Sequence, residues 1–214
     1  MSAEAGQLGR FITLEGGEGV GKSTQAAALA AALEGRGINL LLTREPGGSA
    51  GAEAIRDLLL SGDEGRWSAR AEALLFAAAR ADHIEKTIRP ALQSGAWVLS
   101  DRFLDSSLAY QGAAGGLGMD AIRDLHRFGS GDFLPDRTLV LVLDEAEGSA
   151  RARNRDSGDS DRIGSRPPSY HAAVDAAFRE LAEREPDRVK RVDASGPPET
   201  VTARLLYALG DLLP

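Results

Sequence analysis

The sequence contains no cysteine in its 214 residues. This absence excludes disulfide bonds, thiolate metal sites and a cysteine nucleophile, and it fits the reducing cytoplasm, where we expect the protein to act. Long apolar runs are also missing, because the longest, Ala26–Leu33, is far too short to cross a bilayer. The N-terminus lacks the basic-then-apolar order of a signal peptide. We therefore expect no association with a membrane.

Basic residues are fewer than acidic ones, 25 against 32, which gives a formal net charge of −7. This balance argues against nucleic acid as the main partner, so any anionic ligand must be held by a local group of basic residues. The content of 43% hydrophobic and 27% charged residues is ordinary for a globular enzyme, and the chain is long enough to bury a sizeable core.

Turn-rich pieces alternate with apolar runs in the order strand, helix, strand, which predicts an α/β fold in one domain spanning residues 1–214. Near-continuous apolarity predicts a five-stranded parallel sheet with helices on both faces, its strands at Phe11–Glu15, Ile38–Thr43, Trp97–Ser100, Thr138–Leu143 and Val189–Asp193. Helices are expected at Lys22–Glu34, Ala52–Leu60, Ser68–Leu92, Asp120–Phe128, Ser149–Arg155, Tyr170–Glu183 and Pro198–Leu212. The Ser, Asp, Gly and Pro content of Asp156–Pro168 predicts a mobile surface lid, inserted after the fourth strand at about 146–168.

The clearest motif lies between the first predicted strand and the first predicted helix, and it reads Gly16-Gly17-Glu18-Gly19-Val20-Gly21-Lys22-Ser23, followed by Thr24. It is a full G-x-x-x-x-G-K-[ST] match in the required context. The glycines let successive backbone N–H groups point at phosphate oxygens, and the helix N-terminus adds partial positive charge. In such a loop Lys22 reaches the β- and γ-phosphates, and Ser23 supplies an oxygen to Mg²⁺. The motif predicts a site for a nucleoside triphosphate.

A P-loop alone does not distinguish a switch, a motor and a phosphotransferase. The two asparagines, Asn39 and Asn154, are not followed by the Lys-x-Asp of a guanine reader, which argues against a GTPase. A motor or transporter ATPase stays open, because the fourth predicted strand runs into Asp144 and Glu145. The third predicted strand runs into Asp101, which we expect to be the carboxylate on the metal side, whereas Asp144 is expected to cap a helix.

An acceptor site needs a cation for a second anion, and Arg44 supplies one at the carboxyl end of the second predicted strand, where ligands of open α/β sheets bind. Helical spacing predicts two faces on the long helix: Glu72, Phe76, Arg80 and His83 on one, and Leu74, Ala78, Ala81, Ile84 and Ile88 on an apolar one. The first face suggests a platform on which a planar base stacks on Phe76 while Arg80 donates to an exocyclic oxygen. His83 is expected to be structural.

Nearly the whole chain resembles the thymidylate kinase family of P-loop nucleoside monophosphate kinases. The segments that carry the resemblance are Phe11–Gly16 leading into the P-loop, Thr43–Gly48, Leu75–Arg80, Ser100–Phe103 and Ser106–Gly112. The resemblance implies a P-loop nucleoside triphosphate hydrolase-like fold and a cytoplasmic homodimer. It also implies transfer of the ATP γ-phosphate to dTMP, giving dTDP for nucleotide biosynthesis, with Mg²⁺ as cofactor.

The same resemblance implies roles for individual residues. Glu18 would hold the 3′-hydroxyl of dTMP, Arg44 and Arg102 its phosphate, and Phe76 and Arg80 its thymine ring. Ser107 and Gln111 would line the nucleoside pocket, and Tyr110 would fill the space that a ribose 2′-hydroxyl needs.

The predicted lid carries Arg151, Arg153 and Arg155, whereas the P-loop has no arginine between its glycines. This arrangement resembles the family branch that places the catalytic cation in the lid. Arg151 and Arg155 lie four residues apart and would share one helix face, so they are the expected catalytic pair. The chain departs from the family where Gly164 follows Asp161-Arg162-Ile163, since the family often has a glutamate there. No general base is expected, because a phosphate monoester with a second pKa near ~6 is already an anion.

Overall fold

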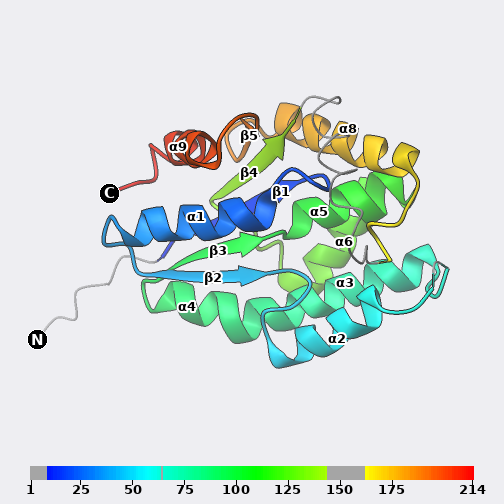
Figure 1. Cartoon of the computed structure of the whole chain (residues 1–214). Helices are drawn as coiled ribbons and strands as arrows, with labels where there is room; N and C mark the ends of the chain where they lie inside the picture. The colour runs from blue at the N-terminus through cyan, green and yellow to red at the C-terminus, as the bar shows by residue number, and fades with distance from the viewer. Residues whose placement is uncertain (1–8, 64, 144–161) are drawn as a thin grey trace, which may run out of the picture.

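The computed structural model describes residues 9–63, 65–143 and 162–214, and in them five parallel strands form one sheet in the order β2-β3-β1-β4-β5. The strands are β1 (Phe11–Gly16), β2 (Leu40–Arg44), β3 (Trp97–Asp101), β4 (Arg137–Val142) and β5 (Val189–Asp193). Helices cover both faces of this sheet (Figure 1), which confirms the predicted fold class. Each predicted strand matches an observed one within two residues at either end.

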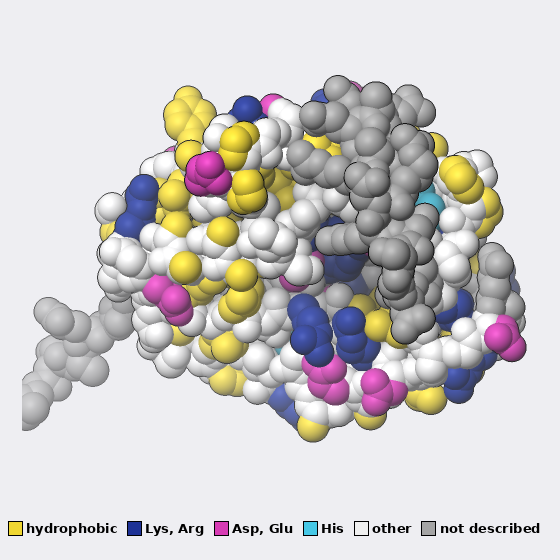
Figure 2. All heavy atoms as spheres, in the orientation of Figure 1, with side chains coloured by type: hydrophobic (Ala, Val, Ile, Leu, Met, Phe, Trp, Pro, Cys, Tyr) yellow, Lys and Arg dark blue, Asp and Glu magenta, His cyan; other side chains and the backbone are white. Residues whose placement is uncertain are grey.

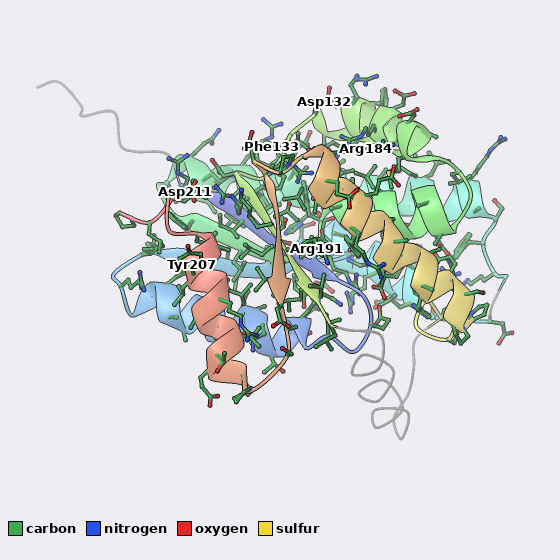
Figure 3. All side chains as sticks on the ribbon, turned by 90° about the horizontal axis from the view of Figure 1, so that it is seen from above. Asp132, Phe133, Arg184, Arg191, Tyr207 and Asp211 are labelled. Carbon is green, nitrogen blue, oxygen red and sulfur yellow. The ribbon has the colours of Figure 1, made fainter. Side chains whose placement is uncertain are left out.

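The two faces of the sheet carry different sets of helices. Of the described helices, α1 (Lys22–Glu34) and α9 (Pro198–Ala208) pack on one face. The opposite face is covered by α3 (Ala69–His83), α4 (Arg89–Gln93), α5 (Leu104–Ser107), α6 (Met119–Ser130) and α8 (Pro168–Arg184). Seen from above, the edge strand β5 runs between α9, which carries Tyr207, and α8, which carries Arg184 (Figure 3). None of the described helices is both long and apolar enough to cross a membrane.

Strand β1 shows how the alternation of side chains builds both layers. Ile12 and Leu14 are fully buried against α1 and α9, whereas Phe11 belongs to the core of the opposite face. Because side chains alternate along a strand, Glu15 also points to the face that holds α5. Strand β1 thus supplies apolar residues to both cores. Its buried Glu15 carboxylate accepts a hydrogen bond at the start of α5.

The long helix predicted at Ser68–Leu92 is interrupted. It consists of α3, the π-helical segment η1 (Ile84–Ile88) and α4, with Pro90 at the first turn of α4. Proline cannot donate a backbone hydrogen bond, so a change of helical register before Pro90 lets the chain continue. A helical pair, α5 and the π-helical η2 (Leu108–Ala114), was not predicted at all. The last of the described helices, α2 (Ala50–Leu60), packs against α3.

The apolar face predicted for α3 is wrong at Leu74 and Ala78. Leu74 is 56% exposed and Ala78 is exposed as well, while Glu72, Arg80 and His83 are buried. The polar side chains face inward because each finds a charged or hydrogen-bonding partner there, and these partners come from distant parts of the chain. Helical periodicity alone cannot show such partners.

Two residues at the described end of the predicted lid, Arg162 and Ile163, are buried, whereas Ser165, Pro167 and Pro168 are exposed, as expected of a surface excursion. Arg162 donates from Nε to the Leu59 carbonyl oxygen at 2.9 Å and from Nη2 to Glu72 at 2.7 Å, and Ile163 is buried beside it. These contacts hold Arg162 and Ile163 against α2 and α3. The rest of the predicted lid, with its helix at 149–155, lies outside the described residues.

Candidate active site

The P-loop connects β1 to α1 and has the backbone that its glycines allow. Gly16 has φ 140°, and a Cβ there would stand 2.6 Å from the Leu141 carbonyl oxygen, so only glycine fits between β1 and β4. The Lys22 ammonium lies inside the loop, donates to the Gly16 carbonyl oxygen at 3.0 Å and is only 8% exposed. Burial, together with the nearby charge of Arg102, lowers the pKa of Lys22 to about 8. An anion in the loop would relieve this cost of burying the ammonium.

Two oxygens beside the P-loop fit a magnesium ion. Parallel pairing of β1 and β3 brings Asp101 next to the loop, where its Oδ2 accepts a hydrogen bond from Ser23 Oγ at 3.1 Å. Its other oxygen, Oδ1, is buried with no hydrogen-bond partner among the described residues. Mg²⁺ is usually held by one or two protein oxygens, with waters and phosphates completing the shell. Within the described residues, no three His, Asp or Glu side chains gather as a denser metal site.

Arg102 lies at the centre of a polar cluster on the other side of the P-loop. Its backbone has φ 72°, which is uncommon for a non-glycine residue. From Nη2 it donates to Glu18 Oε1 at 2.8 Å and to the Tyr110 hydroxyl at 3.2 Å, and Tyr110 itself donates to Glu18 at 3.0 Å. Although burial acts to raise it, the charges of Arg102 and Lys22 hold the pKa of Glu18 below its usual value. Glu18 is therefore an anion between two cations.

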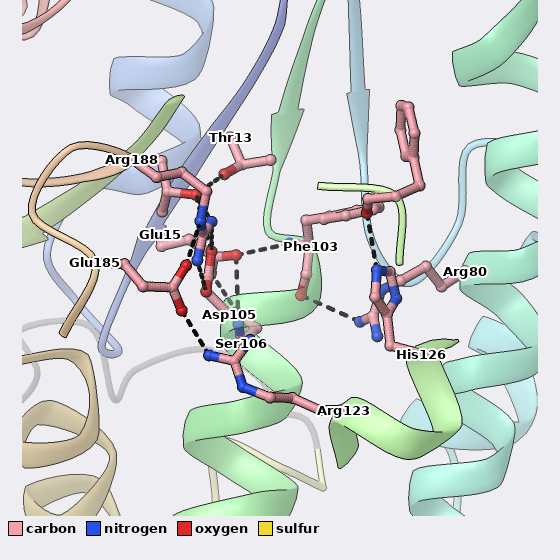
Figure 4. Close-up of polar contacts among 12 residues, drawn as sticks. Thr13, Glu15, Arg80, Phe103, Asp105, Ser106, Arg123, His126, Glu185 and Arg188 are labelled. Carbon is pink, nitrogen blue, oxygen red and sulfur yellow. Dashed lines mark hydrogen bonds and ion pairs between the residues drawn. The ribbon is translucent and has the colours of Figure 1, made fainter. Parts of the chain in front are cut away.

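Glu15 holds the backbone that presents Arg102. Its Oε1 accepts hydrogen bonds from the backbone N–H groups of Phe103 at 2.8 Å and Ser106 at 3.3 Å, and its Oε2 accepts one from the Ser106 hydroxyl (Figure 4). Burial, with Asp105 nearby, raises the pKa of Glu15 to about 8. The start of α5 is thereby tied to the strand that leads into the P-loop. Glu15 was not predicted as a site residue, although its place just before the P-loop was a usable signal.

Asp105 is fixed on the far side of Glu15. It forms a buried ion pair with Arg188 at 2.7 Å and accepts a hydrogen bond from Thr138 at 2.8 Å, and Arg188 also pairs with Glu185 (Figure 4). These contacts connect α5 to β4 and to the turn before β5. The segment that follows Arg102 is thus held by Glu15 of β1 and, through Asp105, by Thr138 of β4 and by Arg188.

Arg80 forms a wall of the site with its guanidinium nearly enclosed. It donates from Nε to Glu45 Oε2 at 2.8 Å and from Nη2 to the Ser107 hydroxyl at 2.7 Å. His83 is fully buried and contacts Glu45 at 3.1 Å and Thr43 at 2.8 Å, so it is the structural residue that the sequence predicted.

A single cavity gathers the predicted acceptor residues. Those that line it are Glu18, Arg44, Phe76, Arg80, Arg102, Ser107, Tyr110 and Gln111, together with Gly19, Gly21, Lys22, Ser23 and Asp101 from the phosphate side. Arg44 is exposed at the rim and pairs with Glu53 at 3.2 Å. Figure 2 shows Lys and Arg side chains around a hollow above α2. The lining also includes Glu45, Arg56 and Ile163, which sequence reasoning did not single out; Arg56 and Ile163 carried no local signal.

Several predicted residues cannot be placed. The lid arginines Arg151, Arg153 and Arg155 lie outside the described residues. So do Asp144 and Glu145, the carboxylates of the ATPase alternative.

Comparison with known proteins agrees with this geometry. The family model described as thymidylate kinase matches residues 14–205. A thymidylate kinase of Rhizorhabdus wittichii is 60% identical, covering 96% of this chain and 99% of its own length, and one of Afipia carboxidovorans is 50% identical, covering 92% and 87%. The crystal structure of thymidylate kinase from Ehrlichia chaffeensis superposes with a TM-score of 0.74 at 29% identity, covering 94% of this chain and 98% of that one. The motor or transporter ATPase is not favoured by these matches, and the chain belongs to the thymidylate kinase family.

Proposed function

We propose that this chain transfers the γ-phosphate of ATP to dTMP, giving ADP and dTDP for nucleotide biosynthesis. An oxygen of the dTMP phosphate forms the new bond to the γ-phosphorus, and the bond between that phosphorus and the oxygen bridging to the β-phosphate breaks. The observation that carries the proposal is that the P-loop and the thymidylate kinase residues of the acceptor side line the same cavity.

The proposed roles follow from charge. The backbone of Gly16–Thr24 and the Lys22 ammonium bind the ATP phosphates, while Arg102 and Arg44 bind the phosphate of dTMP. Two phosphates repel each other, so the main task of these residues is to hold them in line and to neutralise their charge. No side chain has to remove a proton, because the attacking phosphate is already ionised.

Mg²⁺ is proposed to bind at Ser23 and Asp101, where it would neutralise charge on the ATP phosphates. The orphaned Oδ1 of Asp101 and the Ser23 hydroxyl supply the two oxygens from this chain.

We also propose a cytoplasmic homodimer. The exposed apolar side chains of Leu74 on α3 and Phe128 on α6, two helices that pack together, support self-association.

A panel of acceptors tests the proposed reaction. The protein is offered dTMP, dUMP, AMP, GMP and CMP with Mg-ATP, and ADP release is followed in a coupled assay. The highest kcat/KM is expected for dTMP. A preference for AMP, GMP or CMP would contradict the assignment.

The proposed metal site makes Asp101→Asn sensitive to magnesium. The neutral amide keeps the shape of the side chain but weakens an oxygen ligand, so the Mg²⁺ concentration for half-maximal activity should rise about tenfold or more. A Mg²⁺ titration at saturating ATP and dTMP measures this. Asp120→Asn, exposed on α6, is the matched control and should titrate like the parent. A parental titration for Asp101→Asn would argue against this ligand.

Tyr110 is expected to exclude a ribose. Its buried ring is held by the hydroxyl's contacts with Glu18 and Arg102, so the space beside it cannot open easily. Tyr110→Ala should raise kcat/KM for 5-methyl-UMP relative to dTMP by about tenfold or more, the size of effect that a steric pocket gives. Tyr110→Phe keeps the ring and should leave this ratio near the parental value. If the ratio stays constant in Tyr110→Ala, the ring only packs.

A further inference from the structure

Glu72 is a buried carboxylate that no proposed catalytic role uses. It lies on α3, is 2% exposed and does not line the cavity. Its Oε1 accepts a hydrogen bond from Gln111 Nε2 at 2.9 Å, and its Oε2 accepts from Arg162 Nη2 at 2.7 Å and from Arg166 Nη2 at 2.6 Å. Although burial acts to raise it, hydrogen bonds from Gln111 and Arg162 and the charge of Arg166 hold the pKa of Glu72 below its usual value. Glu72 is therefore an anion, and its three polar partners among the described residues are all donors.

This contact fixes which end of the Gln111 amide faces the ligand. An ionised carboxylate only accepts hydrogen bonds, so the end of the amide that faces Glu72 must be the NH₂ group. The carbonyl oxygen, Oε1, is left for the cavity that Gln111 lines. A glutamine without such a neighbour could turn either end toward a ligand.

Arg80 supplies the complementary group on the same cavity. A guanidinium only donates, and Arg80 is held by Glu45 and Ser107 in one orientation. One donor and one acceptor match the edge of a thymine or uracil, which offers O4 as acceptor and N3–H as donor. Cytosine offers the reverse, an amino donor at position 4 and an acceptor at N3, so both contacts would be lost.

We propose that Glu72 is a positioning residue that sets the base specificity of the site, by holding Gln111 with its carbonyl oxygen toward the N3–H of the base. This inference rests on the proposed function, since it concerns the nucleoside monophosphate that the cavity accepts. Glu72 acts through Gln111 and does not touch the substrate.

The two arginines explain why a carboxylate stands at this position. Arg162 is as deeply buried as Glu72, and two guanidinium groups at one carboxylate oxygen require a full negative charge for compensation. The two arginines also connect Glu72, and through it Gln111, to the stretch that carries Ile163, a residue of the cavity lining. The orientation of Gln111 is thus fixed by contacts from two separate segments of the chain.

The test compares dTMP with 5-methyl-dCMP, because these two acceptors differ only at the edge that Gln111 and Arg80 would read. In Glu72→Gln the new amide can donate as well as accept, so Gln111 can turn its NH₂ group toward the base and pair with the N3 of cytosine. The ratio of kcat/KM for dTMP over 5-methyl-dCMP should fall about tenfold or more, which is the effect of losing one or two buried hydrogen bonds. Arg166→Met is the matched control, since it removes one cation but leaves the contact between Glu72 and Gln111, and its ratio should stay parental.

The outcomes separate the inference from the function on which it rests. A parent protein that transfers phosphate to neither acceptor would reject the proposed function itself. A parent that prefers dTMP, with a Glu72→Gln variant that melts cooperatively and keeps the parental ratio, would reject the role of Glu72. If Glu72→Gln does not fold, Glu72→Asp decides, because it keeps the charge for Arg162 and Arg166 but withdraws the carboxylate from Gln111. The dTMP preference should fall in that variant too, and a parental ratio would overturn the inference.

Discussion

The variant Lys22→Ala is expected to lose about 10³-fold in kcat for phosphoryl transfer, the scale seen when a preorganised charge is removed from a transition state. The Lys22 ammonium lies inside the P-loop, bonded to the Gly16 carbonyl oxygen and shielded from water. Its burial costs free energy in the free protein, as its lowered pKa indicates. A phosphate bound in the loop would offset that cost.

The control variant for Lys22→Ala removes the same charge at a site away from the P-loop. Lys86→Ala removes another lysine, one that is exposed and paired with Asp82 on the helix surface, and it should keep parental kcat. Single-turnover measurements with preincubated ATP and dTMP separate the chemical step from binding. If Lys22→Ala stays within about threefold of the parent in this assay, the loop does not act as the triphosphate site.

The second large effect is expected for Arg102→Ala, which should raise the KM for dTMP by about 10²-fold while changing the KM for ATP by less than about threefold. Hydrogen bonds from a guanidinium to phosphate are charge-assisted and often bidentate, so their loss is costly. Arg102 is also the partner that keeps Glu18 and Tyr110 in place. Its removal therefore affects the acceptor side of the cavity more than the P-loop.

Arg102→Lys and Arg191→Ala make this prediction specific. A lysine keeps the positive charge but lacks the planar fork, so Arg102→Lys should recover only part of the dTMP affinity. Arg191 is exposed on the edge strand β5 (Figure 3), and its replacement should leave both KM values parental. If dTMP affinity in Arg102→Ala is parental, Arg102 is only a structural ion pair with Glu18.

The parts of the fold that follow from local sequence were predictable. The strands β1 and β3 are short, mostly apolar runs, and the P-loop motif fixes the end of β1 at Gly16 and the start of α1 at Lys22. The predicted acceptor residues share one cavity because they follow the carboxyl ends of parallel strands or lie on α3 and η2 beside those ends.

What could not be predicted depends on pairs of residues far apart in the chain. Glu72 is buried because Arg162 and Arg166 arrive from about ninety positions further on, as the separations of 90 and 94 residues show. Leu74 is exposed for the same reason, since the face of α3 that turns inward is the one with charged partners. The helical pair α5 and η2 has no clear period in sequence, and its start is set by the hydrogen bonds that Glu15 accepts from Phe103 and Ser106.

The fate of the γ-phosphate is the most direct test of the account. The protein is mixed with ATP labelled in the γ-phosphate, with and without dTMP, and the labelled products are separated and counted. The account predicts that label appears in dTDP in a one-to-one ratio with ADP, and that without dTMP almost no label is released. Label released as free phosphate at the same rate with or without dTMP would contradict it, because the cavity beside the P-loop would then not hold the acceptor.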